Sequence, residues 1–349
     1  MSLAVVTIAV VWLGVVAYAV FGGADFGSGI WDLLAGGDRA GAPIRKRIDR
    51  SIGPVWEANH VWLIFVLVYL WTGFPDAFAA MVTDLFVPLI GAALGIVLRG
   101  AAFVYRKSSS TLSQARLFGI VFAVSSVFTP FFFGAGVGAV ASGRVTLETT
   151  ADPWTVWLNP TSMLGGVLAV GACAWLAAVF LAADAHRDGQ ADLARYFARR
   201  AGITGVVLGA VSLAGIIPLE IDAPTLADRL ERGGAPFVIA SALGGLGAMI
   251  LVWRGRYVEA RPAAVLAVVA ILAGWAVGQY PWLLVDHLEI EEAAGARSTL
   301  WALLLVFVLA GATAVPALVW LLRITDQGQL STSETRPDSS QALLDRRSR

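Results

Sequence analysis

Long apolar stretches follow one another along almost the whole chain and are separated by short polar segments. About 20 apolar residues in a helix cross a bilayer core about 30 Å thick. Helices are required because lipid offers no partner to backbone N–H and C=O groups. The pattern predicts nine membrane-spanning helices, roughly at residues 3–23, 57–75, 77–98, 117–142, 155–183, 201–219, 234–253, 263–283 and 298–322. The third stretch is the least regular, because Asp84 interrupts it.

Lys and Arg are distributed unevenly over the segments that join these stretches. Of the 25 Lys and Arg residues, 21 fall on one alternating set of segments and 4 on the other. The set rich in Lys and Arg is predicted to be cytoplasmic, because these residues accumulate on that side of membrane proteins. The N-terminus then lies outside and the C-terminus inside. We expect residues 1–323 to form one polytopic membrane domain, followed by a polar cytoplasmic tail at 324–349 that is disordered.

The composition agrees with a membrane protein and argues against several other classes. Apolar residues make up 58% of the chain and charged residues only 14%, whereas soluble domains have about a quarter of their residues charged. The net charge is zero, so no nucleic-acid partner is indicated. The single cysteine, Cys173, allows neither an intrachain disulfide nor a Cys-based metal site. The chain has no phosphate loop, nucleophile elbow or zinc-ligand spacing.

Charged residues gather at one end of three consecutive predicted helices. Asp25 follows the first, Glu57 begins the second and Arg99 ends the third, all toward the cytoplasmic side. A charge inside a span costs about 2.5–3.5 kcal/mol, so such side chains normally face other helices or water. We expect a buried cluster in which Arg99 balances carboxylate charge, while Glu57 and His60, on one helix face, take protons. Interfacial capping by the two acids and snorkelling of Arg99 are the simpler alternatives.

Three further polar residues are supporting candidates. Asn59 precedes His60 in the second stretch, and Arg106 follows the third. Asp84 is deeper in the membrane, and we expect it to pair across helices or to line a small polar cavity. The alternative for Asp84 is an ordinary polar residue of the outer leaflet.

His60 lies in a predicted span, a position where histidine can ligate haem. A haem is held by a proximal His, Cys or Tyr, often with a second axial ligand. The other histidines, His186 and His287, lie in loops on opposite sides of the membrane. A hydrogen-bonding or proton-relay role for His60 is therefore favoured over haem ligation.

These motifs resemble those of subunit II of the cytochrome bd-type quinol oxidases, over residues 10–323. The resemblance rests on Gly23-Ala-Asp-Phe-Gly27, residues 53–62, Phe74-Pro75, Leu98-Arg99, Ala102-Phe103, Arg106, Thr129-Pro-Phe-Phe-Phe-Gly134 and Tyr280-Pro281. It implies an all-α integral membrane fold with two four-helix bundles and one peripheral helix. A weak internal likeness between Gly-Ala-Asp at 23–25 and Ala-Ala-Asp at 182–184 agrees with two such halves.

The resemblance also implies a function and partners. The expected complex is a heterodimer in the bacterial plasma membrane that oxidises quinol and reduces dioxygen to water. Its subunit I carries haems b and d and the quinol-oxidising site, so this chain is expected to bind no haem and to hold no catalytic residue. A small single-helix accessory subunit and a bound structural quinone or lipid are further expectations. The acids that match Asp25 and Glu57 are proposed to belong to a proton route from the cytoplasm toward the haems, with Arg99 nearby.

The chain departs from many such relatives at five positions. It has Ala24 where many have Phe, Glu57 and His60 where many have Asp and Gln, and Asp184-Ala185 where many have Lys-Thr. Glu in place of Asp keeps a proton-carrying group, and His60 adds a titratable one. Any role of the lysine does not carry over to Asp184.

Two alternative functions stay open at this point. A proton-coupled secondary transporter would use the polar cluster as its site, but transporters often have inverted repeats and broken helices near the midplane. The repeat suggested here is parallel, and the cluster lies toward one face. The other alternative is a purely structural scaffold within the oxidase, with no proton traffic.

Overall fold

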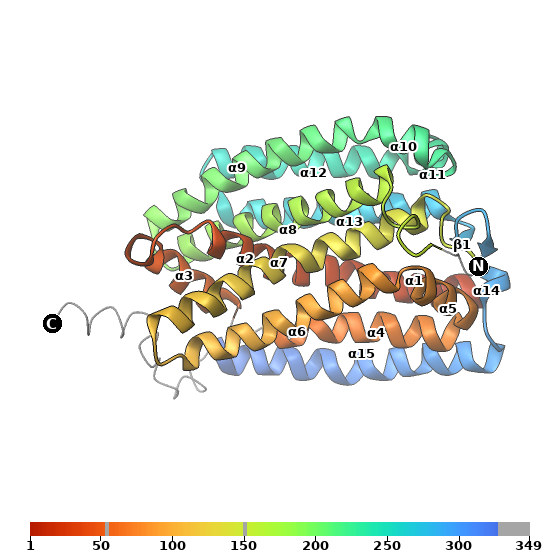
Figure 1. Cartoon of the computed structure of the whole chain (residues 1–349), viewed down its shortest axis with the longest axis horizontal. Coiled ribbons are helices and arrows are strands. Elements are labelled where there is room, and N and C mark those ends of the chain that lie inside the picture. Colours follow the sequence, from red (N-terminus) through yellow and green to blue (C-terminus); the bar gives the residue numbers. More distant parts are fainter. Residues whose placement is uncertain (53–55, 149–151, 327–349) are drawn as a thin grey trace.

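The chain folds into a bundle of long, roughly parallel and antiparallel helices (Figure 1). The structure, a computed structural model, describes residues 1–52, 56–148 and 152–326. Its helices are α1 Leu3–Ala17, π-helix η1 Tyr18–Gly22, α2 Gly23–Leu33, α3 Asp38–Ile52, α4 Trp56–Gly73, α5 Pro75–Asp84, α6 Phe86–Ser108, α7 Leu112–Ala141, α8 Pro160–Arg187, α9 Ala191–Ala214, α10 Ile216–Asp222, α11 Pro224–Arg229, π-helix η2 Leu230–Gly234, α12 Ala235–Trp253, α13 Tyr257–Gln279, α14 Ile290–Ala293 and α15 Arg297–Asp326. Two short strands, β1 Trp282–Leu284 and β2 Leu288–Glu289, pair antiparallel.

The predicted all-α membrane class is confirmed. Within the described residues, seven helical segments are long and apolar enough to cross a membrane: Leu3–Leu33, Phe86–Arg106, Leu112–Ala141, Pro160–Arg187, Ala191–Asp222, Pro224–Trp253 and Tyr257–Gln279. Asn59–Gly73 and Pro75–Asp84 pass the same test only as a pair bent by 120°, and Arg297–Thr313 is a shorter apolar helix. The described residues therefore contain seven candidate crossings, or eight if the bent pair forms one more, and a count of nine stays a prediction.

The second and third predicted spans are divided differently in the structure. α4 ends at Gly73, and α5 leaves it at 120° before α6 begins at Phe86. Phe74 has a non-helical backbone (φ −140°, ψ 61°), and Pro75 follows it as the first residue of α5. Proline suits a helix start because its missing N–H would be unpaired there in any case. Asp84 is consequently the last residue of a short connecting helix, and the long apolar helix starts after it.

The first span continues past its predicted end. α1, η1 and α2 form one segment from Leu3 to Leu33, with the π-helical turn Tyr18–Gly22 in its middle. α2 lies close to α8: a Cβ atom on Gly27 would stand 1.8 Å from the carbonyl oxygen of Cys173. The indole N–H of Trp31 donates to the carbonyl of Ala174 across the same contact, at 2.8 Å. Gly27 therefore allows two helix backbones to meet inside the bundle.

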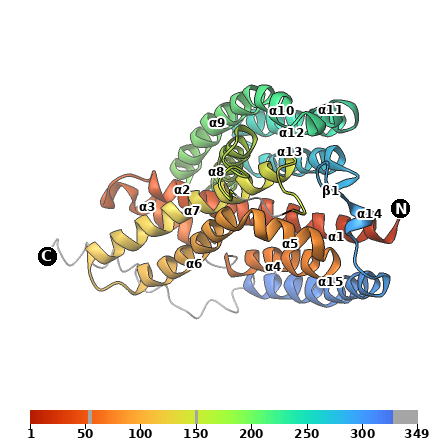
Figure 2. The same cartoon turned by 45° about the vertical axis from the view of Figure 1, so that its right-hand side comes forward.

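The helices form two groups joined through α2, α7 and α8. α6 packs on α7 and α1 on α4, whereas α8 packs on α9 and α13 and α12 packs on α13. α15 lies along α4 and α1 at one flank, opposite α9 and α12 in both Figure 1 and Figure 2. α2 contacts both α7 and α8, so its side chains lie where the two groups meet.

Candidate functional site

Asp25 of α2 and Arg99 of α6 form a buried ion pair. The Arg99 Nη2 and Nη1 atoms donate to Asp25 Oδ1 and Oδ2 at 2.7 and 3.1 Å. Nη2 also donates to the backbone carbonyl of Asp25 at 3.0 Å. Asp25 is 4% exposed and Arg99 2%, so neither side chain reaches the surface of this chain. Burial of Arg99 excludes the snorkelling alternative.

The remaining surface of the Arg99 guanidinium is also occupied. Its Nε donates to Ser126 Oγ at 2.9 Å. Its Cζ lies 5.0 Å from the ring centroid of Phe26 and 4.7 Å from that of Phe122. A buried ion pair stabilises a fold only if further hydrogen bonds offset the loss of water. Four hydrogen bonds and two aromatic faces provide that compensation here.

Small residues bring α2 and α6 close enough to α7 for these contacts. A Cβ on Gly29 would lie 2.1 Å from Ser126 Oγ, and one on Gly95 would lie 2.2 Å from Thr129 Oγ1. α7 supplies both Ser126 and Phe122, whose ring is fully buried. The site is thus built from three helices in direct contact.

A second ion pair lies farther along the same two helices. Arg106 of α6 donates to Asp32 of α2 and to Asp49 of α3. Arg45 of α3 contacts the other oxygen of Asp32, with Nε 3.0 Å from Oδ1. Arg106 also faces the Phe122 ring from 5.0 Å. Phe122 therefore packs against two guanidinium groups.

Asp32 is not among the residues predicted from the sequence. The signal that could have found it is spacing, because Asp32 follows Asp25 by the same seven residues that separate Arg106 from Arg99. Seven residues are close to two helical turns, so each pair of side chains lies on one helix face. The predicted end of the first span at residue 23 placed Asp32 in a loop.

His60 and Asn59 lie next to the ion pair, at the π-helical turn. The half-buried His60 ring is 6.3 Å from that of Tyr18 and 6.2 Å from that of Phe26, measured between centroids. His60 Nδ1 and the Tyr18 hydroxyl are both buried without a hydrogen-bond partner among the described residues. Asn59 Nδ2 donates to the carbonyl of Phe21 at 3.3 Å. The side chain of Glu57 lies outside the described part of the structure.

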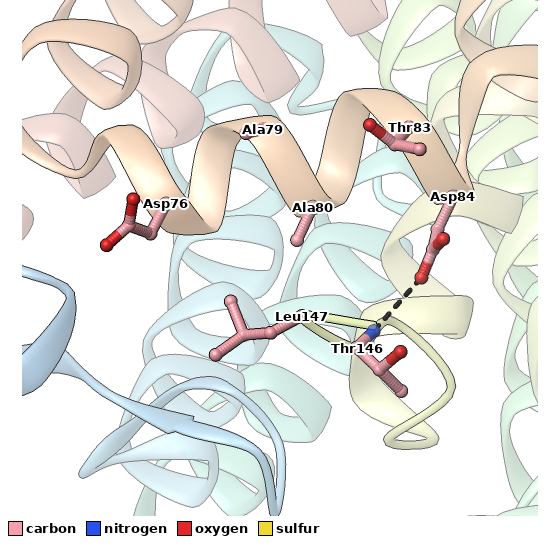
Figure 3. A pocket seen from close by; sticks show the side chains of 7 residues that line it. All are labelled: Asp76, Ala79, Ala80, Thr83, Asp84, Thr146 and Leu147. Atoms are coloured by element: carbon pink, nitrogen blue, oxygen red, sulfur yellow. Dashed lines mark hydrogen bonds between the residues drawn. The ribbon is translucent and has the colours of Figure 1, made fainter. Parts of the chain in front are cut away.

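Asp84 lies away from this cluster, where it lines a cavity at the end of α5 (Figure 3). The cavity has a volume of about 340 Å³ and is lined by Asp76, Ala79, Ala80, Thr83, Asp84, Thr146 and Leu147. The Asp84 carboxylate accepts a hydrogen bond from the backbone N–H of Thr146 at 3.0 Å. Asp84 thus joins the end of α5 to the segment after α7.

Asp184, noted in the sequence only as a departure, is the centre of a third polar group. Arg261 of α13 donates to it, and so does Ser51 Oγ at 3.1 Å. Arg47 Nη2 lies 3.9 Å from Asp184, and Nη1 of the same side chain binds Asp188. The arginines around Asp184 balance its charge.

No group of three or more His, Cys, Asp or Glu side chains that could hold a metal ion occurs among the described residues. The buried polar groups are instead organised as ion pairs between helices. Charged side chains inside a membrane protein are usually paired in this way, because burying an unpaired charge there is costly in free energy.

The fold and these ion pairs define a polytopic α-helical membrane protein with charged groups paired inside its bundle. Residues 3–325 match the family described as "Cytochrome bd terminal oxidase subunit II", and the chain belongs to that family. With its apolar helices, this membership makes it a multi-pass protein of the bacterial inner membrane.

Individual relatives match over shorter segments. The chain is 28% identical over 194 residues to "Cytochrome bd ubiquinol oxidase subunit 2" of Bacillus subtilis, covering 54% of this chain and 55% of the relative. It is 26% identical over 163 residues to "Cytochrome bd-I ubiquinol oxidase subunit 2" of Escherichia coli K12, covering 45% and 42%. The matched segments thus span about half the length of these curated relatives.

One solved structure shares the fold over nearly the whole chain. It is "The structure of bd oxidase from Geobacillus thermodenitrificans", with a TM-score of 0.74 and 24% identity. The superposition covers 93% of this chain and 99% of the other.

Proposed function

We propose that this chain is the haem-free subunit II of a terminal quinol oxidase. The complex oxidises quinol and reduces dioxygen to water, and a subunit I carries haems b and d and the quinol site. The observation that carries this proposal is the family match over residues 3–325. The names of the Bacillus and Escherichia relatives, both ubiquinol oxidase subunits, support the same substrate class.

The proposed membrane plan has nine crossings, with the N-terminus outside. The seven long apolar segments, the α4–α5 pair and α15 together supply nine. The 21-to-4 division of Lys and Arg supports this count, because one missed crossing would destroy the alternation. The two helix groups then form four-crossing halves, and α15 is the peripheral ninth helix.

Asp25, Arg99, Asn59 and His60 form a group that we call the Asp25 cluster. Its proposed role is to support proton delivery from the cytoplasm. Both carboxylate oxygens of Asp25 accept hydrogen bonds from Arg99. The proposed role of Asp25 is therefore to fix the position of the buried charges of this ion pair. His60 has a ring nitrogen without a partner beside the Tyr18 hydroxyl, which suits it to exchange protons through water. Glu57, three residues before His60 on α4, is the proposed cytoplasmic entry of this route.

The proposed function is tested by purifying the chain from its native membrane in mild detergent. We expect a complex whose optical spectrum contains haems b and d and which consumes oxygen when quinol is supplied. A stable, haem-free protein that never co-purifies with a second large subunit would contradict the proposal. Quinol-driven oxygen consumption in vesicles, with no solute transported across the membrane, would exclude the transporter alternative.

Glu57→Gln tests whether this subunit handles protons or serves only as a scaffold. We expect slower quinol-driven oxygen consumption at unchanged haem content, because glutamine cannot carry a proton. The matched control is Asp192→Asn, whose carboxylate is 94% exposed at the start of α9. Wild-type turnover in the Glu57→Gln complex would favour the scaffold.

A further inference from the structure

A small basic cavity lies between α3 and the turn that joins α8 to α9. Its volume is about 150 Å³. Pro43, Lys46, Arg47 and Arg50 of α3 line one side, and Gln190 and Leu193 line the other. None of these residues contacts the Asp25 cluster through the ion pairs described above.

The cavity carries more positive than negative charge. Asp188 is one nearby acid: Arg47 donates to its Oδ2 atom, and Arg50 Nη1 lies 3.8 Å from the same oxygen. Lys46 is exposed, and no carboxylate pairs with it among the described residues. Asp184, the second carboxylate near Arg47, is also bound by Arg261. Four cations (Lys46, Arg47, Arg50 and Arg261) therefore face two carboxylates, and the excess of positive charge favours an anion.

Gln190 indicates that the anion also carries a hydrogen-bond donor. Its Oε1 atom is buried and has no partner among the described residues. An amide oxygen only accepts hydrogen bonds, so its partner must be an O–H or N–H group. A buried acceptor left without a partner destabilises the fold, so an occupant with a hydroxyl group would relieve this cost.

The cavity lies at the end of the membrane-spanning helices, on the Lys- and Arg-rich side. α3 contains five Lys and Arg residues. Ile44 and Ile48 of α3 are buried in the core, while Lys46 and Arg50 are exposed. α8 ends at Arg187, three residues before Gln190. An amphipathic basic helix at this level has the position and charge of a segment that meets phospholipid headgroups.

We propose that this cavity binds the phosphate group of an anionic phospholipid headgroup that also bears a hydroxyl, as in phosphatidylglycerol. Lys46 and Arg50 bind the phosphate oxygens, and Gln190 Oε1 accepts a hydrogen bond from the headgroup hydroxyl. Arg47 binds Asp188 and so keeps this carboxylate away from the phosphate. The cavity shares no residue with the cluster of Asp25, Arg99 and His60. Lipid binding there goes beyond the proposed oxidase function and can be tested without measuring oxygen consumption.

The test uses the protein purified in mild detergent with its bound partner, stripped of lipid and titrated with short-chain phosphatidylglycerol. Native mass spectrometry counts the lipids retained. We expect saturable binding that weakens by roughly tenfold or more in Lys46→Gln/Arg50→Gln, because two surface cations are lost. The matched control is Arg195→Gln on α9, whose side chain is 72% exposed and which should bind as the wild type does. Equal retention of phosphatidylglycerol by the wild type and the double variant would overturn the proposal.

Two further arms identify the source of the phosphate and the role of Gln190. Phosphatidylcholine of the same chain length should bind more weakly, and inorganic phosphate at equal concentration should not displace the lipid. Displacement by inorganic phosphate would overturn the lipid as its source. Gln190→Leu should lose the preference for phosphatidylglycerol over phosphatidic acid, which lacks the glycerol hydroxyls. A preference unchanged in Gln190→Leu would overturn the hydroxyl contact.

Discussion

Asp32 lies seven residues beyond Asp25 on α2, and each binds an arginine of α6. The two arginines are also seven residues apart, so the ion pairs repeat at an interval of about two helical turns. α2 and α6 are therefore joined at two levels by the same kind of contact. Phe122 of α7 packs against both guanidinium groups.

Replacing one partner of the inner pair should be more harmful than replacing both. Arg99→Leu leaves the Asp25 carboxylate buried without a counter-charge, and we expect a loss of about 3–5 kcal/mol in stability. Arg99→Leu/Asp25→Leu should recover part of this loss. Thermal unfolding of the purified complexes in detergent measures both effects. A double variant less stable than Arg99→Leu would argue against this account.

Gly27→Ala should separate α2 from α8. The added methyl group would lie 1.8 Å from the carbonyl oxygen of Cys173, a backbone atom that cannot move alone. We expect a loss of about 1–3 kcal/mol from overpacking. Gly209→Ala in α9 is the control, since its added Cβ would meet no atom within 4 Å. If the two variants unfold at the same temperature, the close approach of α2 and α8 is not required.

Asp84→Ala should loosen the segment after α7 without affecting the Asp25 cluster. The variant removes the acceptor of the Thr146 N–H. We expect faster hydrogen exchange in peptides that contain Thr146, while Asp84→Asn, which keeps an acceptor oxygen, exchanges more slowly than Asp84→Ala. Exchange at α2 and α6 provides the internal reference. Unchanged exchange at Thr146 in Asp84→Ala would contradict this role.

His60→Gln should flatten the pH dependence of quinol-driven oxygen consumption between about pH 5 and 8, because His is the side chain that ordinarily titrates there. Among the side chains that the structure describes, the charged and titratable groups near the ring are Tyr18, Asp25 and Arg99. Tyr18→Phe removes the neighbouring hydroxyl and should slow turnover with little change in the pH profile. A wild-type pH profile in His60→Gln would show that His60 does not titrate during turnover.

Much of the charged cluster could be predicted from the sequence, because a charge in an apolar stretch needs a partner inside the bundle. Asp25 and Arg99 were expected in one cluster for that reason, and the structure joins them directly. Asp32 was not expected, since the π-helical turn at Tyr18–Gly22 continues into α2 and hydropathy does not record such a turn. The boundary near Phe74 and Pro75 was predicted, but the separate short helix α5 was missed, because its residues are apolar enough to be read as the start of the third span.

The two ion pairs between α2 and α6 fix the register of these helices. Sliding either helix by one turn would move its charged groups about 5.4 Å, which breaks both contacts at once and leaves four charges in an apolar interior. α2 and α6, with Phe122 against both arginines, should therefore move as one rigid unit during turnover, and any conformational change must occur at helices outside this unit.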